Sequence, residues 1–279
     1  MIYLDWNVIV HLINGDYPEL QKAINFAKLD GKFIIPFTST HVEEATNIKS
    51  KSEQKQRLQF LSELSENNYF ENSVTDLGLV KRHPTEVYNT ITEVWIPKGL
   101  MRKLGNIITR PMLMLIRKLL KLDPQKLNNI PPNKVWGEID QIIKSSNYAN
   151  KLPAYMKKSP IREILKFNED TSIEQFGAIN ESFGVLASRA IASDMKVASL
   201  YSLLETFGYY PEKKKTFEKA SRFADGLHCY YSQWSEICVS RDKGFRAKSQ
   251  AIASLTNSTV RYVAPEYAHE YINQLVGIN

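Results

Sequence analysis

Residues 1–13 read MIYLDWNVIVHLI. Ile2, Tyr3 and Leu4 form a short apolar run that ends at Asp5. Beyond this run, apolar residues recur at the spacing of one helix face: Val8, Ile9, Leu12 and Ile13. The pattern predicts a buried strand followed directly by a helix, with an acidic residue between them.

The same order of elements recurs along the chain. Residues 33–35 are predicted as a second strand closed by Pro36, and residues 41–67 as the following helix. Near the C-terminus the pattern predicts a helix over 216–234, a strand over 237–239, a helix over 247–255, a strand over 260–263 and a helix over 266–276. This alternation predicts an α/β fold with a central parallel sheet flanked by helices. One apolar stripe is predicted to face the core: Leu227, Tyr230, Tyr231 and Trp234.

The middle of the chain has a different character. Residues 76–215 contain most of the prolines and show helical patterns without a clear strand. We therefore expect a core built from residues 1–75 and 216–279, interrupted by a mainly helical insertion or subdomain over 76–215.

Composition and charge limit the class of protein. The chain has 279 residues, of which 43% are hydrophobic and 24% charged, which excludes a mostly disordered chain. Its formal charge of +6 permits a polyanionic partner without requiring one. Two cysteines in a chain of this length favour a reducing cytoplasm. The apolar stretch over 111–122 is too short and too basic to span a membrane, so no transmembrane segment is expected.

Acidic residues occupy similar positions in several predicted units. Asp5 and Asp242 follow strands, Glu43 and Glu44 lie near the start of a helix, and Asp225 lies near the start of another. Parallel strands place their carboxyl ends at one edge of the sheet, so these acids could converge there. Each has a simpler interpretation as a helix cap, a turn residue or part of a solvated helix face. A convergent set of carboxylates favours Mg²⁺ or Mn²⁺, because these ions prefer oxygen ligands.

Four segments together resemble the PIN-domain nuclease family. They read IYLDWNVI from residue 2, IPFTSTHVEE from residue 35, FADGLHCYY from residue 223 and ICVSRDKGF from residue 237. The resemblance covers roughly residues 1–70 and 216–279, and the long middle segment departs from the family pattern. It implies a three-layer PIN-like fold and a metal-dependent ribonuclease that leaves a 5′-phosphate and a 3′-hydroxyl.

The resemblance also implies roles for individual residues. Asp5, Asp225 and Asp242 would be catalytic metal ligands, and either Glu43 or Glu44 would be the helix acid, with Glu44 favoured. Asn7 and Ser240 would orient a carboxylate or a bound water. Single-stranded DNA as a second substrate, an inhibitor protein of the toxin–antitoxin kind and a homodimer stay open. So do roles as a toxin, a defence effector or an RNA-processing enzyme.

Basic residues concentrate in two places. Residues 98–126 carry eight basic side chains and a single acidic one, and include Arg117, Lys118 and Lys121. This segment could bind a phosphate backbone, a lipid surface or an acidic partner, or it could be a solvated helix face. Arg241, Lys243 and Arg246 surround Asp242 and are better placed to hold phosphate near the acids.

Other functions remain alternatives. A haloacid-dehalogenase-like phosphatase would also place an aspartate after the first strand, but it usually carries a second aspartate where this chain has Asn7. A PIN-like module that binds RNA or protein without cleaving is the other alternative. His41 and His228 are interpreted as helix-start and core residues rather than as catalytic groups.

Overall fold

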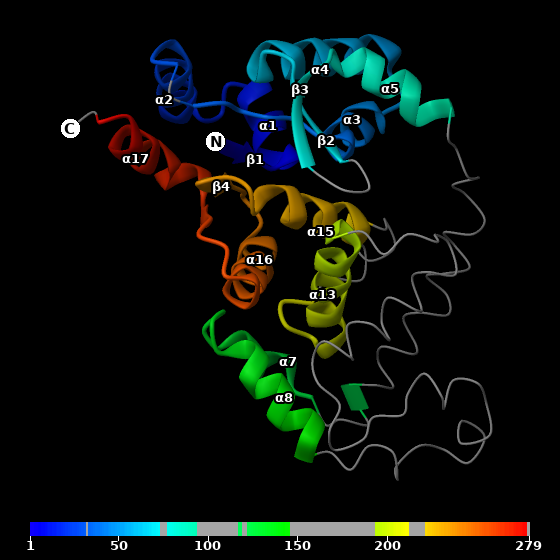
Figure 1. The fold of residues 1–279 in the computed structure, drawn as a ribbon, viewed down its shortest axis with the longest axis vertical. Helices are drawn as coiled ribbons and strands as arrows, with labels where there is room; N and C mark the ends of the chain where they lie inside the picture. Colours follow the sequence, from blue (N-terminus) through cyan, green and yellow to red (C-terminus); the bar gives the residue numbers. More distant parts are fainter. Residues whose placement is uncertain are drawn as a thin grey trace. The chain divides into compact units, whose positions relative to one another are not determined.

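The computed structural model describes residues 1–31, 33–72, 77–93, 117–118, 122–145, 193–211 and 221–277 (Figure 1). The chain divides into two compact units. The first unit contains Met1–Ile96, Tyr230–Arg246 and Ser258–Asn279, and the second contains Pro97–Cys229 and Ala247–Asn257. The division predicted from the sequence stays a prediction: a core over 1–75 and 216–279, interrupted by an insertion over 76–215.

A small parallel sheet lies in the first unit. Its strands are β1 (Ile2–Leu4), β4 (Ile237–Val239) and β5 (Arg261–Val263), in the order β1-β4-β5. Leu4 pairs with Val239, and Val239 pairs with Val263, so the three strands end at the same level. All side chains of β1 and β4 are buried, which is typical of strands covered on both faces. The mixed α/β architecture and the three strands of this sheet are as the sequence predicts.

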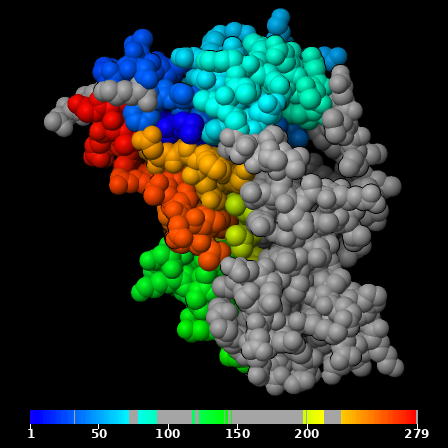
Figure 2. Space-filling view, viewed as in Figure 1, coloured from blue at the N-terminus to red at the C-terminus, as the bar shows by residue number. Residues whose placement is uncertain are grey.

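Helices surround this sheet within the first unit. They are α1 (Trp6–Ile13), α2 (Pro18–Leu29), α3 (Ser39–Thr46), α4 (Lys51–Ser65), α5 (Pro84–Glu93) and α17 (Pro265–Val276). Helix α1 buries Trp6, Val8, Ile9 and Leu12 in the core. This confirms the predicted apolar face for Val8, Ile9 and Leu12, whereas Ile13, at the end of the helix, is 38% exposed. Helices α2 and α17, from opposite ends of the chain, lie side by side (Figures 1 and 2).

The predicted strand over residues 33–35 is not formed. The segment is extended but makes one hydrogen bond to β1, from the Ile2 N–H to the Ile34 carbonyl at 3.0 Å. Pro36 has no N–H, so the segment cannot continue a ladder of hydrogen bonds. Phe37 instead forms an isolated bridge with Tyr69.

The predicted helix over 41–67 is two helices. Helix α3 ends at Thr46, and Ser50 caps α4 by accepting a hydrogen bond from the Glu53 N–H at 3.3 Å. Between them, Gln54 donates to the carbonyls of Thr46 and Ile48 at 2.8 and 2.7 Å. A side chain thus satisfies carbonyls that the end of α3 leaves unpaired.

The fold also contains a hairpin that the sequence pattern does not predict. Strands β2 (Asn68–Asn72) and β3 (Leu77–Lys81) pair antiparallel, and β3 falls in the segment where no strand was expected. Trp234 differs from its prediction as well, since it is 54% exposed. Helix α15 (Ser221–Ser232) ends before this residue, so the helical stripe that buries Tyr230 and Tyr231 does not extend to it.

The described part of the second unit is helical. It contains α7 (Pro124–Asn128), α8 (Val135–Ser145), α13 (Ser193–Phe207), the start of α15 and most of α16 (Lys243–Thr256). The indole N–H of Trp136 donates to the Ala251 carbonyl at 2.9 Å and connects α8 to α16. Among the helices that the structure describes, none has the length and apolar character to cross a membrane.

Candidate functional site

The carboxylate of Asp5 is held in place at the end of β1. Asp5 occupies the N-cap position of α1, but its side chain makes no capping hydrogen bond. Its Oδ2 atom instead accepts hydrogen bonds from Ser240 Oγ at 2.5 Å and from Asn7 Nδ2 at 2.6 Å. Asp5 is only 8% exposed. Two neighbouring side chains therefore orient a buried carboxylate, and the roles of Asn7 and Ser240 in a functional site stay a prediction.

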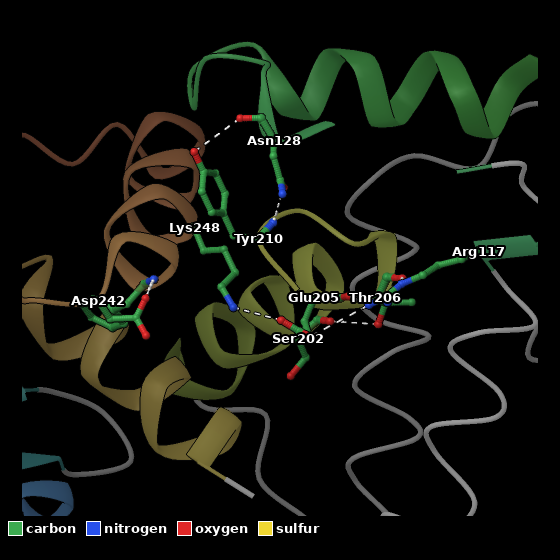
Figure 3. A network of polar contacts seen from close by, with 9 residues as sticks. Arg117, Asn128, Ser202, Glu205, Thr206, Tyr210, Asp242 and Lys248 are labelled. Atoms are coloured by element: carbon green, nitrogen blue, oxygen red, sulfur yellow. Dashed lines mark hydrogen bonds and ion pairs between the residues drawn. The ribbon is translucent and has the colours of Figure 1, made fainter. Parts of the chain in front are cut away.

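The hydroxyl group of Ser240 also connects the Asp5 carboxylate to the backbone of Asp242. Its backbone N–H donates to Ser240 Oγ at 3.1 Å, and Ser240 is fully buried. Its Oδ1 atom accepts a hydrogen bond from the Phe245 N–H at 2.9 Å and so caps α16 (Figure 3). The simple interpretation of Asp242 as a helix cap is thus correct for one of its oxygens. From the described residues Oδ2 accepts no hydrogen bond, which leaves it available to a ligand.

The parallel pairing of β1 and β4 explains this arrangement. Leu4 pairs with Val239, so Asp5 and Ser240 follow paired residues and leave the sheet at the same edge. The Asp5 N–H donates to the Val239 carbonyl at 2.9 Å and continues the ladder by one more bond. Ends of parallel strands lie at the same edge, as the sequence-based argument requires.

His41 connects α3 to the end of β1. The Thr38 N–H donates to His41 Nδ1 at 3.0 Å, so Nδ1 carries no proton and Nε2 donates to the Leu4 carbonyl at 2.8 Å. Thr38 and His41 also form a reciprocal capping box at the start of α3. The predicted role of His41 at a helix start is confirmed. His228, the other histidine interpreted as a core residue, is 1% exposed.

The tyrosine beside His41 is deeply buried. The rings of Tyr3 and His41 lie 5.1 Å apart. Burial raises the pKa of the Tyr3 hydroxyl well above its ordinary value; a hydrogen bond with Thr38 opposes the shift, and the charge of Asp5 contributes to it. Tyr3 therefore stays protonated at neutral pH.

The other predicted acids are not part of this pair. Glu43 is exposed on α3 and Glu44 is half-buried there. Asp225 is half-buried within α15, in the part of that helix that belongs to the second unit, so the N-cap interpretation of Asp225 is wrong. Within the described ranges no group of three His, Cys, Asp or Glu side chains is placed to hold a metal ion. The roles of Glu43, Glu44 and Asp225 stay predictions.

The basic residues around Asp242 differ in their contacts. Arg246 Nη1 donates to the Ser240 carbonyl at 2.5 Å and so supports the segment after β4. Arg241 and Lys243 are exposed. The backbone N–H of Arg241 donates to Asn7 Oδ1 at 3.3 Å, so the amide of Asn7 connects the Asp5 carboxylate to the Arg241 backbone.

The basic segment over 98–126 is described only in part. Lys118 is exposed, whereas Lys121 lies outside the described residues. Arg117 is half-buried and donates to the Thr206 carbonyl at 2.9 Å and to the Glu205 carbonyl. These contacts occupy several of its donors within the protein. Phosphate binding by Arg117, Lys118 and Lys121 stays a prediction.

A buried ion pair stabilises the second unit. Lys248 on α16 donates to Glu205 on α13 at 3.0 Å, and their side chains are 2% and 1% exposed. The ammonium of Lys248 also lies 4.5 Å from the centre of the Tyr201 ring. Figure 3 shows this pair together with Arg117, which approaches the Glu205 carboxylate to 3.9 Å. Nothing in the sequence pattern indicated this pairing, because its members lie 43 residues apart.

The chemistry of the Asp5–Asp242 pair fits a divalent cation. Both donors are carboxylate oxygens, and Mg²⁺ is often bound by one or two carboxylates together with water and substrate phosphates. No family model, curated protein or solved structure matches the chain.

Proposed function

We propose that this chain is a divalent-metal-dependent nuclease with a PIN-like core, acting on RNA phosphodiester bonds. The observation that carries the proposal is the buried carboxylate of Asp5. It lies at a helix N-terminus but does not cap the helix, and two neighbouring side chains orient it. A purely structural aspartate at this position would be expected to cap α1.

The residues that would hold Mg²⁺ or Mn²⁺ are Asp5 and Asp242, with Glu44 and Asp225 as further predicted ligands. A bound cation supplies Lewis acidity and neutralises the charge that develops on a phosphodiester. Ser240 and Asn7 fix the Asp5 carboxylate through hydrogen bonds to one of its oxygens. Asp242 has one oxygen in the helix cap, and its exposed position leaves the other accessible to solvent. Arg241 and Lys243 supply positive charge beside the pair.

The decisive test uses purified protein and a mixture of single-stranded and structured RNA, with Mg²⁺, with Mn²⁺ or with EDTA. The variant is Asp242→Asn, because an asparagine side-chain oxygen can still accept the bond from the Phe245 N–H and keep the cap. Cleavage that needs the metal and is lost in this variant supports the proposal. Asp5→Asn should lose cleavage as well.

The matched control is Glu270→Gln, which removes one charge from an exposed position on α17. It should cleave as the wild type does. If the wild type cleaves no substrate but retains RNA, the binding-module alternative replaces the nuclease. If cleavage persists in Asp242→Asn, the assignment of the acid pair is wrong.

A further inference from the structure

Three polar side chains form a chain of contacts beside the acid pair. His11 Nδ1 lies 2.6 Å from Asp16 Oδ2, and His11 Nε2 lies 2.7 Å from Arg241 Nη1. Asp16 follows α1, and Arg241 lies two residues beyond the end of β4. His11 is one helical turn beyond Asn7, so both side chains lie on the face of α1 that Arg241 contacts. Neither His11 nor Asp16 was predicted from the sequence as a functional residue. The spacing of four residues between Asn7 and His11 was the signal that could have indicated His11.

The partners of the imidazole determine where its proton lies. A guanidinium group can only donate, so His11 Nε2 accepts the hydrogen bond from Arg241. Nδ1 therefore carries the proton and donates to Asp16. The ring is neutral in this arrangement, and both of its nitrogens are held in place.

The guanidinium group of Arg241 has more N–H donors than its hydrogen bond with His11 uses. Its guanidinium group carries five N–H bonds, and its side chain is exposed. In the part of the chain that the structure describes, no carboxylate lies within 4.0 Å of it to form an ion pair. Among the described residues, the side-chain hydrogen bond that its guanidinium group makes is with a neutral imidazole. An arginine fork paired in this way matches the geometry of a phosphate group, which it can bind through two parallel bonds.

We propose that Arg241 and His11 form a subsite for a phosphate group of the substrate, which replaces the hydrogen bond between them. The proposal rests on the proposed function, because that function supplies the nucleic acid. In the occupied subsite, His11 takes up a proton and donates from Nε2 to the phosphate. Asp16 stabilises the resulting imidazolium through Nδ1, as carboxylates do in other Asp–His pairs.

The surroundings of His11 favour this exchange. Asp16 and Arg241 are the charged groups that contact the ring, and the Tyr17 ring packs edge-on at 5.6 Å. Glu266 from α17 interacts with Tyr17. A protonated His11 would direct its Nε2–H at the Arg241 guanidinium group, and two donors cannot form a hydrogen bond with each other. Protonation of His11 therefore breaks its hydrogen bond with Arg241, and the guanidinium group becomes available to an anion. Phosphate affinity should therefore rise as the pH falls, because the occupied subsite holds one proton more than the empty one.

The test measures binding of the dinucleoside monophosphate uridylyl-uridine by NMR titration of the full chain, with EDTA present. Its single phosphodiester keeps one charge between about pH 5.5 and about pH 7.5, so a change in affinity over that range reflects the protein. We expect binding to be about fivefold tighter at the lower pH, which is near the lower end of coupling between linked sites. His11→Gln should bind equally at both pH values, and Arg241→Gln should bind weakly at both.

The matched control is Arg261→Gln, which removes the same charge from an exposed position at the opposite end of the sheet. It should bind as the wild type does. Equal losses in Arg241→Gln and Arg261→Gln, no binding by the wild type, or an unchanged pH dependence in His11→Gln would each overturn the subsite. Metal-dependent RNA cleavage is measured separately. If RNA is cleaved but the dinucleotide does not bind in this pattern, the proposed subsite is wrong and the proposed nuclease function stands. If the dinucleotide binds in this pattern but RNA is not cleaved, the proposed nuclease function is wrong and the subsite stands.

Discussion

Replacing Ser240 with alanine tests the bridge between the two acids. The hydroxyl donates to the Asp5 carboxylate at 2.5 Å and accepts from the Asp242 N–H at 3.1 Å, in a fully buried position. A hydrogen bond to a charged group contributes about 1.5–3 kcal/mol and a neutral one about 0.5–1.5 kcal/mol. Losing both should lower the free energy of unfolding by about 2–4 kcal/mol, with some recovery as neighbours relax.

Urea denaturation followed by circular dichroism measures this change. The midpoint should fall while the dependence of the unfolding free energy on urea stays constant, because the amount of surface exposed on unfolding is the same. The control is Ser254→Ala on the exposed face of α16, whose hydroxyl donates to the Gln250 carbonyl at 2.9 Å within the same helix. It should change stability by less than about 0.5 kcal/mol. If Ser240→Ala is equally small in effect, the bridge does not orient Asp5.

Three further predictions concern the rest of the fold. Lys248→Met should destabilise the protein by up to about 3–5 kcal/mol in urea, because the buried Glu205 carboxylate loses its partner at 3.0 Å and keeps the more distant Arg117 at 3.9 Å. Adding Glu205→Gln should recover part of the loss, and a double variant less stable than the single one would contradict this. Gly226→Ala should lower the melting temperature, since a new methyl group would lie 2.8 Å from the backbone of α13, whereas Gly137→Ala meets nothing within 4 Å and should be neutral or slightly stabilising. The pKa of Tyr3 is raised by burial, so its contribution to stability is complete below about pH 10 and is lost as the pH rises above that value. Urea midpoints measured from about pH 8 to about pH 11 should fall less steeply in Tyr3→Phe, and an equal slope would count against Tyr3 as the titrating group.

Elements with local sequence signals could be predicted from the amino-acid sequence. The apolar run of Ile2–Leu4 gave a strand, and Pro265 began the last helix at its first position. Local patterns failed where one residue removed a hydrogen bond or where a side chain ended a helix. Pro36 prevented a strand, and Ser50 began a new helix inside a segment predicted as continuous.

The contacts of the acidic side chains, in contrast, depend on how distant segments pack together. An aspartate after a strand is equally suited to capping a helix and to bonding across the sheet, and both outcomes occur here. Asp242 caps α16, whereas Asp5 bonds to Ser240, which lies 235 residues away in the sequence. The pairing of His11 with Arg241, across 230 residues, likewise depends on β1 and β4 lying side by side. Such contacts arise when distant segments pack together, so they cannot be predicted from the composition and spacing around each residue.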